Sequence, residues 1–471
     1  MLFALPGDAL AQITWRRTYG GFGTDQAASV RQVSDGGYII AGSTGSFGNG
    51  ASDIYVVRVD EMGLPLWSRT YGGPGVETGV ACRELADGFI IAGTVSPGPY
   101  GGYDMMLVRT DQQGSPLWER FHGTSDWDIL NGMDVLDDGF VLAGISYGMG
   151  YPMGNGCIVR TDADGHEVWR TALGGIHRVE CRGVLGTSDG GFIVVGGMGT
   201  EARQEDGFFT KLDAEGVEQW TTPVGGDSTD YLHSVVEVEG AGYVAIGATR
   251  SQIETQQIHM VMVDLDGQVV WERFIGSGAD AGGTELQRGH GANEFVFTGY
   301  NTLNLGARDM ILTRTDLGGW WQSGFNYGDG RTADGYSVDV TDDGGYVVAG
   351  WAEGYGPGIR AMYVVKTDQD LQTASLTVNP YIDPLPVEEV PAPEWVRVHP
   401  NPARPGEIVH VSGGAMPGAI VRLFDAHGRC LTQDVLFDAG FTAPDLADGW
   451  YVLELGGAPG RVVRTPLLLQ R

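Results

Sequence analysis

Short runs of β-branched and aromatic residues, separated by glycine-rich turns, recur along most of the chain. The first group of four such runs covers residues 28–33, 38–42, 54–60 and 65–71. Val, Ile, Tyr and Trp dominate these runs, as is typical of strands, and no helical hydrophobic period accompanies them. The pattern therefore predicts an all-β protein built from short antiparallel strands.

Three sequence motifs repeat at one period. A hydrophobic run that ends in Gly recurs seven times, and each copy is followed by a run that ends in Asp, such as VVRVD or LVRTD. Four strands in about 51 residues, repeated seven times around an axis, predict a seven-bladed β-propeller. A Trp marks the period at intervals of 50 to 52 residues, at Trp15, Trp67, Trp118, Trp169, Trp220, Trp271 and Trp321.

The turns between the third and fourth strands begin with Asp and end with Gly, as in Asp60-Glu-Met-Gly63. This spacing favours a type I turn followed by a left-handed glycine. The chain holds 77 Gly among 471 residues and 60 acidic against 29 basic residues. Repeated Asp- and Gly-containing turns explain much of both excesses without invoking flexibility.

The phase of the repeats predicts how the ring closes. The first Trp-containing strand, at about 13–19, has no earlier strands in its own repeat, and the last repeat lacks a Trp-containing strand after 363–367. We therefore expect the N-terminal strand to complete the last blade, which removes an open sheet edge. The propeller is predicted to span residues 12–371.

The net charge of −31 argues against nucleic acid as a partner, because phosphate binding needs clustered Lys and Arg. It also disfavours anionic membrane surfaces, and no apolar stretch is long enough to predict a transmembrane segment. Residues 1–11 end in Ala-Leu-Ala before Gln12, which is typical of the cleavage site of a secretory signal peptide. Without a basic start, this segment is either a signal-peptide remnant or a disordered tail.

After the propeller, residues 372–394 predict a stiff Pro-rich linker, and residues 395–471 predict a small β-sandwich. This last part resembles the type A C-terminal sorting domain of the bacterial type IX secretion system. The resemblance implies export by the type IX machinery to the medium or the outer-membrane surface of a diderm bacterium. The matching positions, in the order of the family pattern, are Pro400, Asn401, Pro402, Asp425, Gly428, Gly449, Tyr451 and Arg464.

The repeats themselves resemble glycine-rich bacterial propeller repeats with the signature D-G-G-[YF] before a hydrophobic run and A-G. They also share features with quinoprotein propellers, although those normally have eight blades and a cofactor site. The resemblance supports the propeller and leaves its ligand open, since propellers host unrelated functions.

Acidic residues stand just before the first strand of most repeats. If they ring one mouth of the channel, they can bind a hard cation such as Ca²⁺ or a basic or hydroxylated ligand; otherwise each caps the backbone of its own blade. No other cofactor is expected. The residues are Asp25, Glu77, Asp128, Glu180, Asp230 and Asp334.

The loops between the second and third strands vary most and carry aromatic residues among Gly, Ser and Asn, a composition that suits recognition of glycans or peptides. These candidate ligand-binding residues are Tyr100, Tyr103, Tyr147, Tyr151, Tyr300, Trp351 and Tyr355. The sequence offers no catalytic constellation and no metal-ligand spacing among its nine His and four Cys residues.

Three functional hypotheses follow. The first is a secreted, non-catalytic binding or scaffold protein that contacts a glycan or a protein ligand through its variable loops. The second is an extracellular hydrolase or lyase with its active site at the mouth of the channel. The third is a quinoprotein-like dehydrogenase.

Overall fold

The computed structural model describes two compact units, Met1–Pro380 and Tyr381–Arg471. In the first unit it describes residues 12–199, 204–276, 278–291, 293–302, 306–356 and 358–374. In the second it describes residues 397–399, 403–404, 406–412, 420–424, 430–435, 440–442, 446, 449–458 and 461–469. The proposed signal remnant, most of the predicted linker, and Pro400, Asn401, Pro402, Asp425 and Gly428 lie outside these residues.

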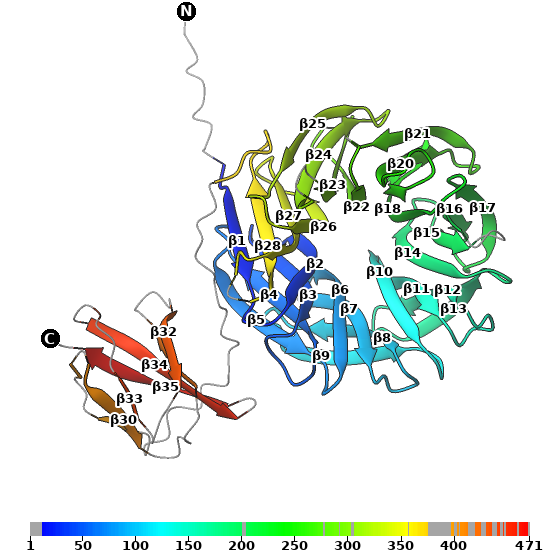
Figure 1. Cartoon of the computed structure of the whole chain (residues 1–471). Coiled ribbons are helices and arrows are strands. Elements are labelled where there is room, and N and C mark those ends of the chain that lie inside the picture. Colours follow the sequence, from blue (N-terminus) through cyan, green and yellow to red (C-terminus); the bar gives the residue numbers. More distant parts are fainter. Residues whose placement is uncertain are drawn as a thin grey trace, which may run out of the picture. The chain divides into compact units, whose positions relative to one another are not determined.

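Seven antiparallel sheets of four strands each are arranged in a ring around a central channel, as the sequence predicts (Figure 1). The first six blades take their four strands in chain order, with the first strand innermost. The blades are β2–β5 (Asp25–Gln32, Tyr38–Thr44, Asp53–Val59, Pro65–Tyr71), β6–β9 (Val76–Leu85, Gly88–Ser96, Asp104–Thr110, Pro116–His122), β10–β13 (Asp128–Leu136, Gly139–Ser146, Asn155–Asp162, Glu167–Leu173), β14–β17 (Val179–Gly186, Phe192–Gly199, Glu205–Leu212, Glu218–Val224), β18–β21 (Asp230–Val238, Gly242–Thr249, Gln257–Val263, Val269–Ile275) and β22–β25 (Ala281–Arg288, Glu294–Thr302, Arg308–Asp316, Trp321–Asn326).

Blade 7 confirms the predicted closure. It consists of β26 (Ala333–Val340), β27 (Tyr346–Glu353), β28 (Arg360–Thr367) and the N-terminal strand β1 (Trp15–Tyr19). β1 runs antiparallel to β28, with Trp15 opposite Lys366 and Tyr19 opposite Met362. Figure 1 shows β1 beside β28, so the two ends of the propeller share one sheet.

The repeated Trp and Gly residues join each blade to the next. The Trp15 indole N–H donates a 3.0 Å hydrogen bond to the carbonyl of Glu61, in the turn of the following blade. A Cβ on Gly63 of that turn would lie only 2.8 Å from Trp15 Cε2, so the ring leaves no room for a side chain. The equivalent glycines all have the predicted left-handed conformation, with φ from +73° to +80° at Gly63, Gly114, Gly165, Gly216, Gly267 and Gly319.

Trp321 is not the seventh member of this Trp series. Trp271 stands opposite Met262, but in blade 6 the corresponding partner, Arg314, stands opposite Ser323. Trp321 lies two residues earlier and is 64% exposed. The turn that would receive its ring has Leu371 in place of Gly, at φ +63° and fully buried. Since no indole covers this turn, a leucine side chain takes the space.

The hydrophobic core lies between adjacent blades. One cluster, for example, combines Ile39 and Val56 of blade 1 with Phe89 and Ile91 of blade 2. Because both faces of the middle strands are covered, β3 and β4 are buried at every position. Cys82, Cys157 and Cys181 are buried in these interfaces as free thiols. Among the described residues, no helix is long and apolar enough to cross a membrane.

The second unit contains two antiparallel sheets, as the predicted small sandwich requires. Their orders are β29-β30-β33 and β32-β31-β34-β35. Gly449 and Tyr451 of the sorting motif fall in β34, and Arg464 falls in β35. The strands are β29 (Arg397–His399), β30 (Ile408–Ser412), β31 (Ile420–Phe424), β32 (Cys430–Val435), β33 (Gly440–Thr442), β34 (Gly449–Ala458) and β35 (Arg461–Leu469).

Candidate functional site

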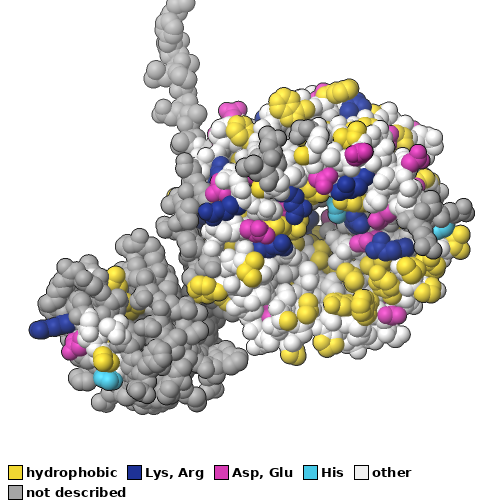
Figure 2. All heavy atoms as spheres, viewed as in Figure 1, with side chains coloured by type: hydrophobic (Ala, Val, Ile, Leu, Met, Phe, Trp, Pro, Cys, Tyr) yellow, Lys and Arg dark blue, Asp and Glu magenta, His cyan; other side chains and the backbone are white. Residues whose placement is uncertain are grey.

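The loops that enter the blades and the loops between their second and third strands lie on one face of the propeller, as predicted. In blade 3 the Tyr147 amide donates a 2.8 Å hydrogen bond to the carbonyl of Trp127, which joins the two kinds of loop. We call this side the loop face. Figure 2 shows a face of the propeller that is hollowed at its centre, with Lys and Arg side chains gathered around the opening.

An aromatic groove lies on the loop face where blades 2 and 3 adjoin. Trp127 is 49% exposed, and its ring stands edge to face with Tyr103 at 5.3 Å and with Tyr147 at 6.1 Å. Beside it runs a groove of about 600 Å³, lined by Asp126, Trp127, Tyr147, Gly148, Gly150 and Pro152. We call this feature the aromatic groove.

Local glycines hold the groove in shape. A Cβ on Gly102 would lie 2.2 Å from Trp127 Cδ1, so only glycine lets the indole lie against the loop between β7 and β8. The Asp128 amide donates a 2.7 Å hydrogen bond to the Tyr103 carbonyl and ties that loop to the start of β10. The position of the exposed indole is therefore fixed by the loop between β7 and β8.

Sequence reasoning missed Trp127, although it predicted Tyr103 and Tyr147. Trp127 stands in the loop that enters β10, and the prediction considered aromatic residues only in the loops between second and third strands. A signal was present, because Trp127 falls outside the 51-residue Trp series and follows the turn-rich run Gly-Thr-Ser-Asp. Tyr100, which is 59% exposed, and Tyr151 lie in the same two loops as Tyr103 and Tyr147.

The three aromatic candidates of blades 6 and 7 are held by other side chains. Trp351 is buried, donates a 3.0 Å hydrogen bond to the Tyr336 hydroxyl and lies under the Arg360 guanidinium at 3.9 Å. Tyr355 is buried against Tyr363, with ring centroids 5.2 Å apart. Tyr300 accepts a 2.5 Å hydrogen bond from Gln256. The prediction of exposed contact surface is therefore wrong for Trp351 and Tyr355, which serve packing.

The six acids predicted at the channel mouth fall into two sets. Four of the acids occupy the same position in the pairing of the first and second strands of their blades. In each of these blades, the residue just before the β-bulge pairs with the repeated Gly, and the acid lies two residues before that residue. These acids are Asp25, Glu77, Asp128 and Asp230. Glu180 and Asp334 stand one residue later, so their side chains point to the opposite face of the strand. The six carboxylates therefore do not form one ring.

Three acids of the first set, Asp25, Asp128 and Asp230, hold the loops of their own blades, as the alternative interpretation predicts. Asp25 accepts hydrogen bonds from the Gly21 amide at 2.8 Å and the Ser46 hydroxyl at 2.7 Å. Asp230 accepts equivalent bonds from Gly226 and Ser251 at 2.9 and 2.6 Å. All four acids are almost fully buried. Burial raises the pKa of Glu77 to about 7.

Glu180 and Asp334 form ion pairs near the channel. Asp334 forms a 2.8 Å ion pair with Arg308, and burial nevertheless raises the pKa of Asp334 to about 6. Glu180 lies 2.5 Å from Arg178 and 3.5 Å from Arg182, and the same two arginines lie 3.8 and 3.2 Å from Glu205. We call Arg178, Glu180, Arg182 and Glu205 the charged cluster. Its formal charge is zero.

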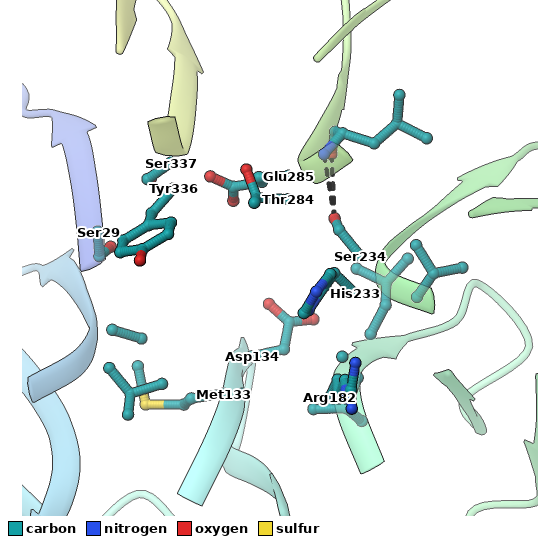
Figure 3. Close-up of a pocket in the computed structure, with 18 of the residues that line it drawn as sticks. Ser29, Met133, Asp134, Arg182, His233, Ser234, Thr284, Glu285, Tyr336 and Ser337 are labelled. Carbon is teal, nitrogen blue, oxygen red and sulfur yellow. Dashed lines mark hydrogen bonds between the residues drawn. The ribbon is translucent and has the colours of Figure 1, made fainter. Parts of the chain in front are cut away.

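Every inner strand carries a β-bulge, which sequence reasoning did not predict. The bulge turns one extra side chain in each blade toward the channel. These residues line a channel cavity of about 380 Å³, and Figure 3 shows four of them around the same space. The bulge residues are Ala28, Val80, Asn131, Arg182, His233, Thr284 and Tyr336.

Below the bulge residues, a buried ion pair links blades 1 and 6 across blade 7. The Arg31 guanidinium donates to Glu285, and also to the Ser337 hydroxyl at 2.8 Å. Glu285 accepts a further 2.8 Å hydrogen bond from the Val338 amide. Burial disfavours the charge of Glu285, but Arg31 holds the pKa of that carboxyl below its usual range. This pair joins three blades in the channel wall.

Among the described residues, no three His, Cys, Asp or Glu side chains are arranged to hold a metal ion. The aromatic groove and the channel cavity offer aromatic surface and polar hydrogen-bonding groups. Such an arrangement can bind an uncharged, hydroxyl-rich ligand by stacking and hydrogen bonding.

In the comparison with known proteins, no family model and no curated protein matches the chain. Among solved structures it is similar to the periplasmic gluconolactonase of Pseudomonas aeruginosa, with 11% identity and a TM-score of 0.46. The match covers 72% of this chain and 100% of that one.

Proposed function

We propose that this protein is an exported, non-catalytic propeller that binds a glycan through the aromatic groove. The observation that carries the proposal is Trp127, a half-exposed indole set rigidly between Tyr103 and Tyr147. Sugar rings present apolar C–H faces that stack on such a surface, while their hydroxyls reach polar groups at its edge. Asp126 and the glycine-lined backbone of the groove supply those groups.

A glycan is favoured over a protein ligand by the small size of the groove. Its lining consists of six residues, which are one indole, one phenol, three small or ring-shaped residues and a carboxylate. A stable protein interface usually needs a larger continuous surface, about 800 Å² from each partner. A protein ligand is therefore an alternative outcome of the test below.

The first test replaces Trp127 with Ala in the full chain and measures binding to a panel of polysaccharides and peptides. We expect the loss of a central aromatic contact to weaken glycan binding by about 30-fold or more, since such residues typically contribute ~2 kcal/mol. Trp320→Ala is the matched control, because Trp320 is also an exposed Trp, 62% accessible, but belongs to the turn before β25. Equal losses in both variants, or capture of peptides alone, would refute the glycan proposal.

The same incubation also tests the second hypothesis, an extracellular hydrolase or lyase. The observation that favours it is the charged cluster, where burial raises the pKa of Glu205 even though Arg182 and Arg178 oppose the shift. Paired carboxylates are the common machinery of glycoside hydrolysis. New chain ends in the recovered glycan would establish catalysis, whereas unchanged chain lengths agree with a binding protein.

Export is the second part of the proposal, and it is supported by the sorting-domain resemblance of residues 395–471. We expect a reporter fused to these residues to reach the cell surface or medium of a diderm bacterium that has a type IX system. The measurement is reporter activity in the medium, on intact cells and in the periplasm. A strain without the secretion machinery is the control, and equal export from both strains would contradict this assignment.

A further inference from the structure

A second pocket lies at the mouth of the channel, apart from the aromatic groove. Its volume is about 440 Å³, within the ~300–1,000 Å³ range of small-molecule sites. We call it the mouth pocket. Strands β10, β14 and β18 supply all of its lining residues, which are Asn131, Glu180, Arg182, Tyr231 and His233.

The β-bulges of three successive blades create this pocket. Asn131, Arg182 and His233 are the extra residues of β10, β14 and β18, so their side chains point toward the channel and not into a blade interface. Figure 3 shows Arg182 and His233 side by side in the channel wall. The bulge therefore recurs in every blade, and its residue is polar in these three blades. In blades 1 and 2 the same position holds Ala28 and Val80.

His233 is the residue of this pocket whose side chain makes no hydrogen bond within the described part of the chain. Its ring stands edge to face with Tyr231 at 5.1 Å, and within the described part of the chain neither ring nitrogen has a hydrogen-bond partner. Burial, aided by the charge of Arg182, lowers the pKa of His233 to about 3. The imidazole is thus neutral at ordinary pH and offers one donor and one acceptor to a ligand.

The remaining groups of the pocket are fixed in place and balanced in charge. Arg182 lies over the Tyr231 ring at 4.3 Å and pairs with Glu180 and Glu205. Asn131 donates a 3.0 Å hydrogen bond to the Cys181 carbonyl, which orients its amide. Planar amide, carboxylate and guanidinium groups beside a neutral imidazole match the hydroxyls of a sugar, which both donate and accept. A net charge of zero favours a neutral ring over a strong ion.

The mouth pocket and the aromatic groove are connected. Tyr147, which lines the groove, contacts Arg178, and Arg178 pairs with Glu180, which lines the pocket. Burial opposes the charge of Arg178, but Glu180, Glu205 and the Tyr147 hydroxyl together raise its pKa. Arg178 and Glu180 therefore lie between the aromatic groove and the mouth pocket.

We propose that the mouth pocket holds the terminal sugar of a neutral glycan chain whose next residues lie along the aromatic groove. This inference rests on the proposed glycan-binding function and adds that recognition begins at a chain end. A ligand bound in this way buries its last ring among Asn131, Glu180 and His233, while the groove stacks on rings further along. We expect an internal segment of a polysaccharide, which continues in both directions, to fit this pocket less well than a chain end does.

The test compares hexasaccharides with intact and blocked ends, using cellohexaose, xylohexaose and chitohexaose. One set is reduced to the alditol at the reducing end, and another is methylated at the terminal hydroxyl of the other end. We expect the full chain to bind one of the three sugars, and one of the two modifications to weaken that binding about tenfold or more, because buried hydrogen bonds are lost. His233→Ala is expected to lower affinity for the intact sugar by a similar factor and to abolish the discrimination.

His166→Ala is the control, since His166 is exposed in the turn between β12 and β13, on the other side of the propeller. It is expected to bind like the natural chain. Equal affinity for intact and both blocked hexasaccharides, with Trp127→Ala still reducing all of them, would overturn end recognition and leave the groove proposal standing. Binding of none of the three sugars, nor of any polysaccharide in the panel, would overturn both.

Discussion

A chain that begins at residue 22, and so lacks β1, is expected to lose cooperative unfolding and to aggregate. β1 supplies five residue pairs to β28, from Trp15 to Tyr19, and removing it exposes the hydrogen-bonding edge of β28. An open edge of this kind is a template for pairing with other chains. The Tyr19 hydroxyl also donates a 2.8 Å hydrogen bond to the Gly63 carbonyl, so the loss weakens the junction of blades 7 and 1 as well.

Thermal unfolding followed by circular dichroism, together with light scattering, measures this effect. A chain that begins at residue 12 is the control and is expected to melt as the full protein does. If the shorter chain also melts in one sharp transition at the same temperature, the closure of the ring contributes little and our account of it fails. A rescue by added β1 peptide would show that the missing strand itself is responsible.

The sequence was sufficient to predict the blades because the same residues specify the turns and interfaces in most repeats. Asp60 and Gly63 define a turn locally, and Trp15 requires that Gly63 have no side chain. Six copies of such a rule leave little freedom in the fold. The closure followed from the phase of these copies alone.

The rule failed at blade 6, and the reason is physical. A Trp at the expected spacing suggested that Trp321 docks like its counterparts, yet Ser323 holds that position and Leu371 fills the space. The two changes occur together, because the turn has a glycine where an indole packs on it and a leucine where the indole is absent. Reading the turn residue together with the Trp would have revealed the shift, because residues 368–371 lack the glycine.

The candidate site was less predictable because it depends on side-chain direction. In the sequence, Glu180 and Asp334 lie only one residue away from the position of the other acids. A shift of one residue along a strand turns the side chain to the opposite face of the sheet. The bulges that point Asn131, Arg182 and His233 into the channel have no sequence signature of their own. Trp127 joins Tyr103 and Tyr147 only through the packing of two loops.

The largest single-residue effect on stability is expected at the buried ion pair of the channel wall. Arg31→Met leaves Glu285 charged, buried and without its cation, and breaking such a pair typically costs about 3–5 kcal/mol. Arg83, Asp339 and Asp134 also face this region. Chemical denaturation at pH 7 measures the loss, with Arg250→Met as the control, because Arg250 and Asp280 form an exposed pair worth ~0–1 kcal/mol.

The effect should depend on pH with a defined sign. In the natural protein Arg31 lowers the pKa of Glu285 in the folded state. The ion pair therefore adds its full stability at pH values above the unfolded-state pKa of Glu285. This stability is lost as the pH falls through the folded-state pKa of Glu285. In Arg31→Met burial raises that pKa instead, so the variant is penalised most at neutral pH and least near pH 4, where Glu285 takes up a proton. The double variant Arg31→Met, Glu285→Gln removes both charges and should recover most of the lost stability at pH 7. If the single and double variants were equally unstable, the loss would come from packing of the Arg31 side chain, and the ion pair would not be what joins blades 1, 6 and 7.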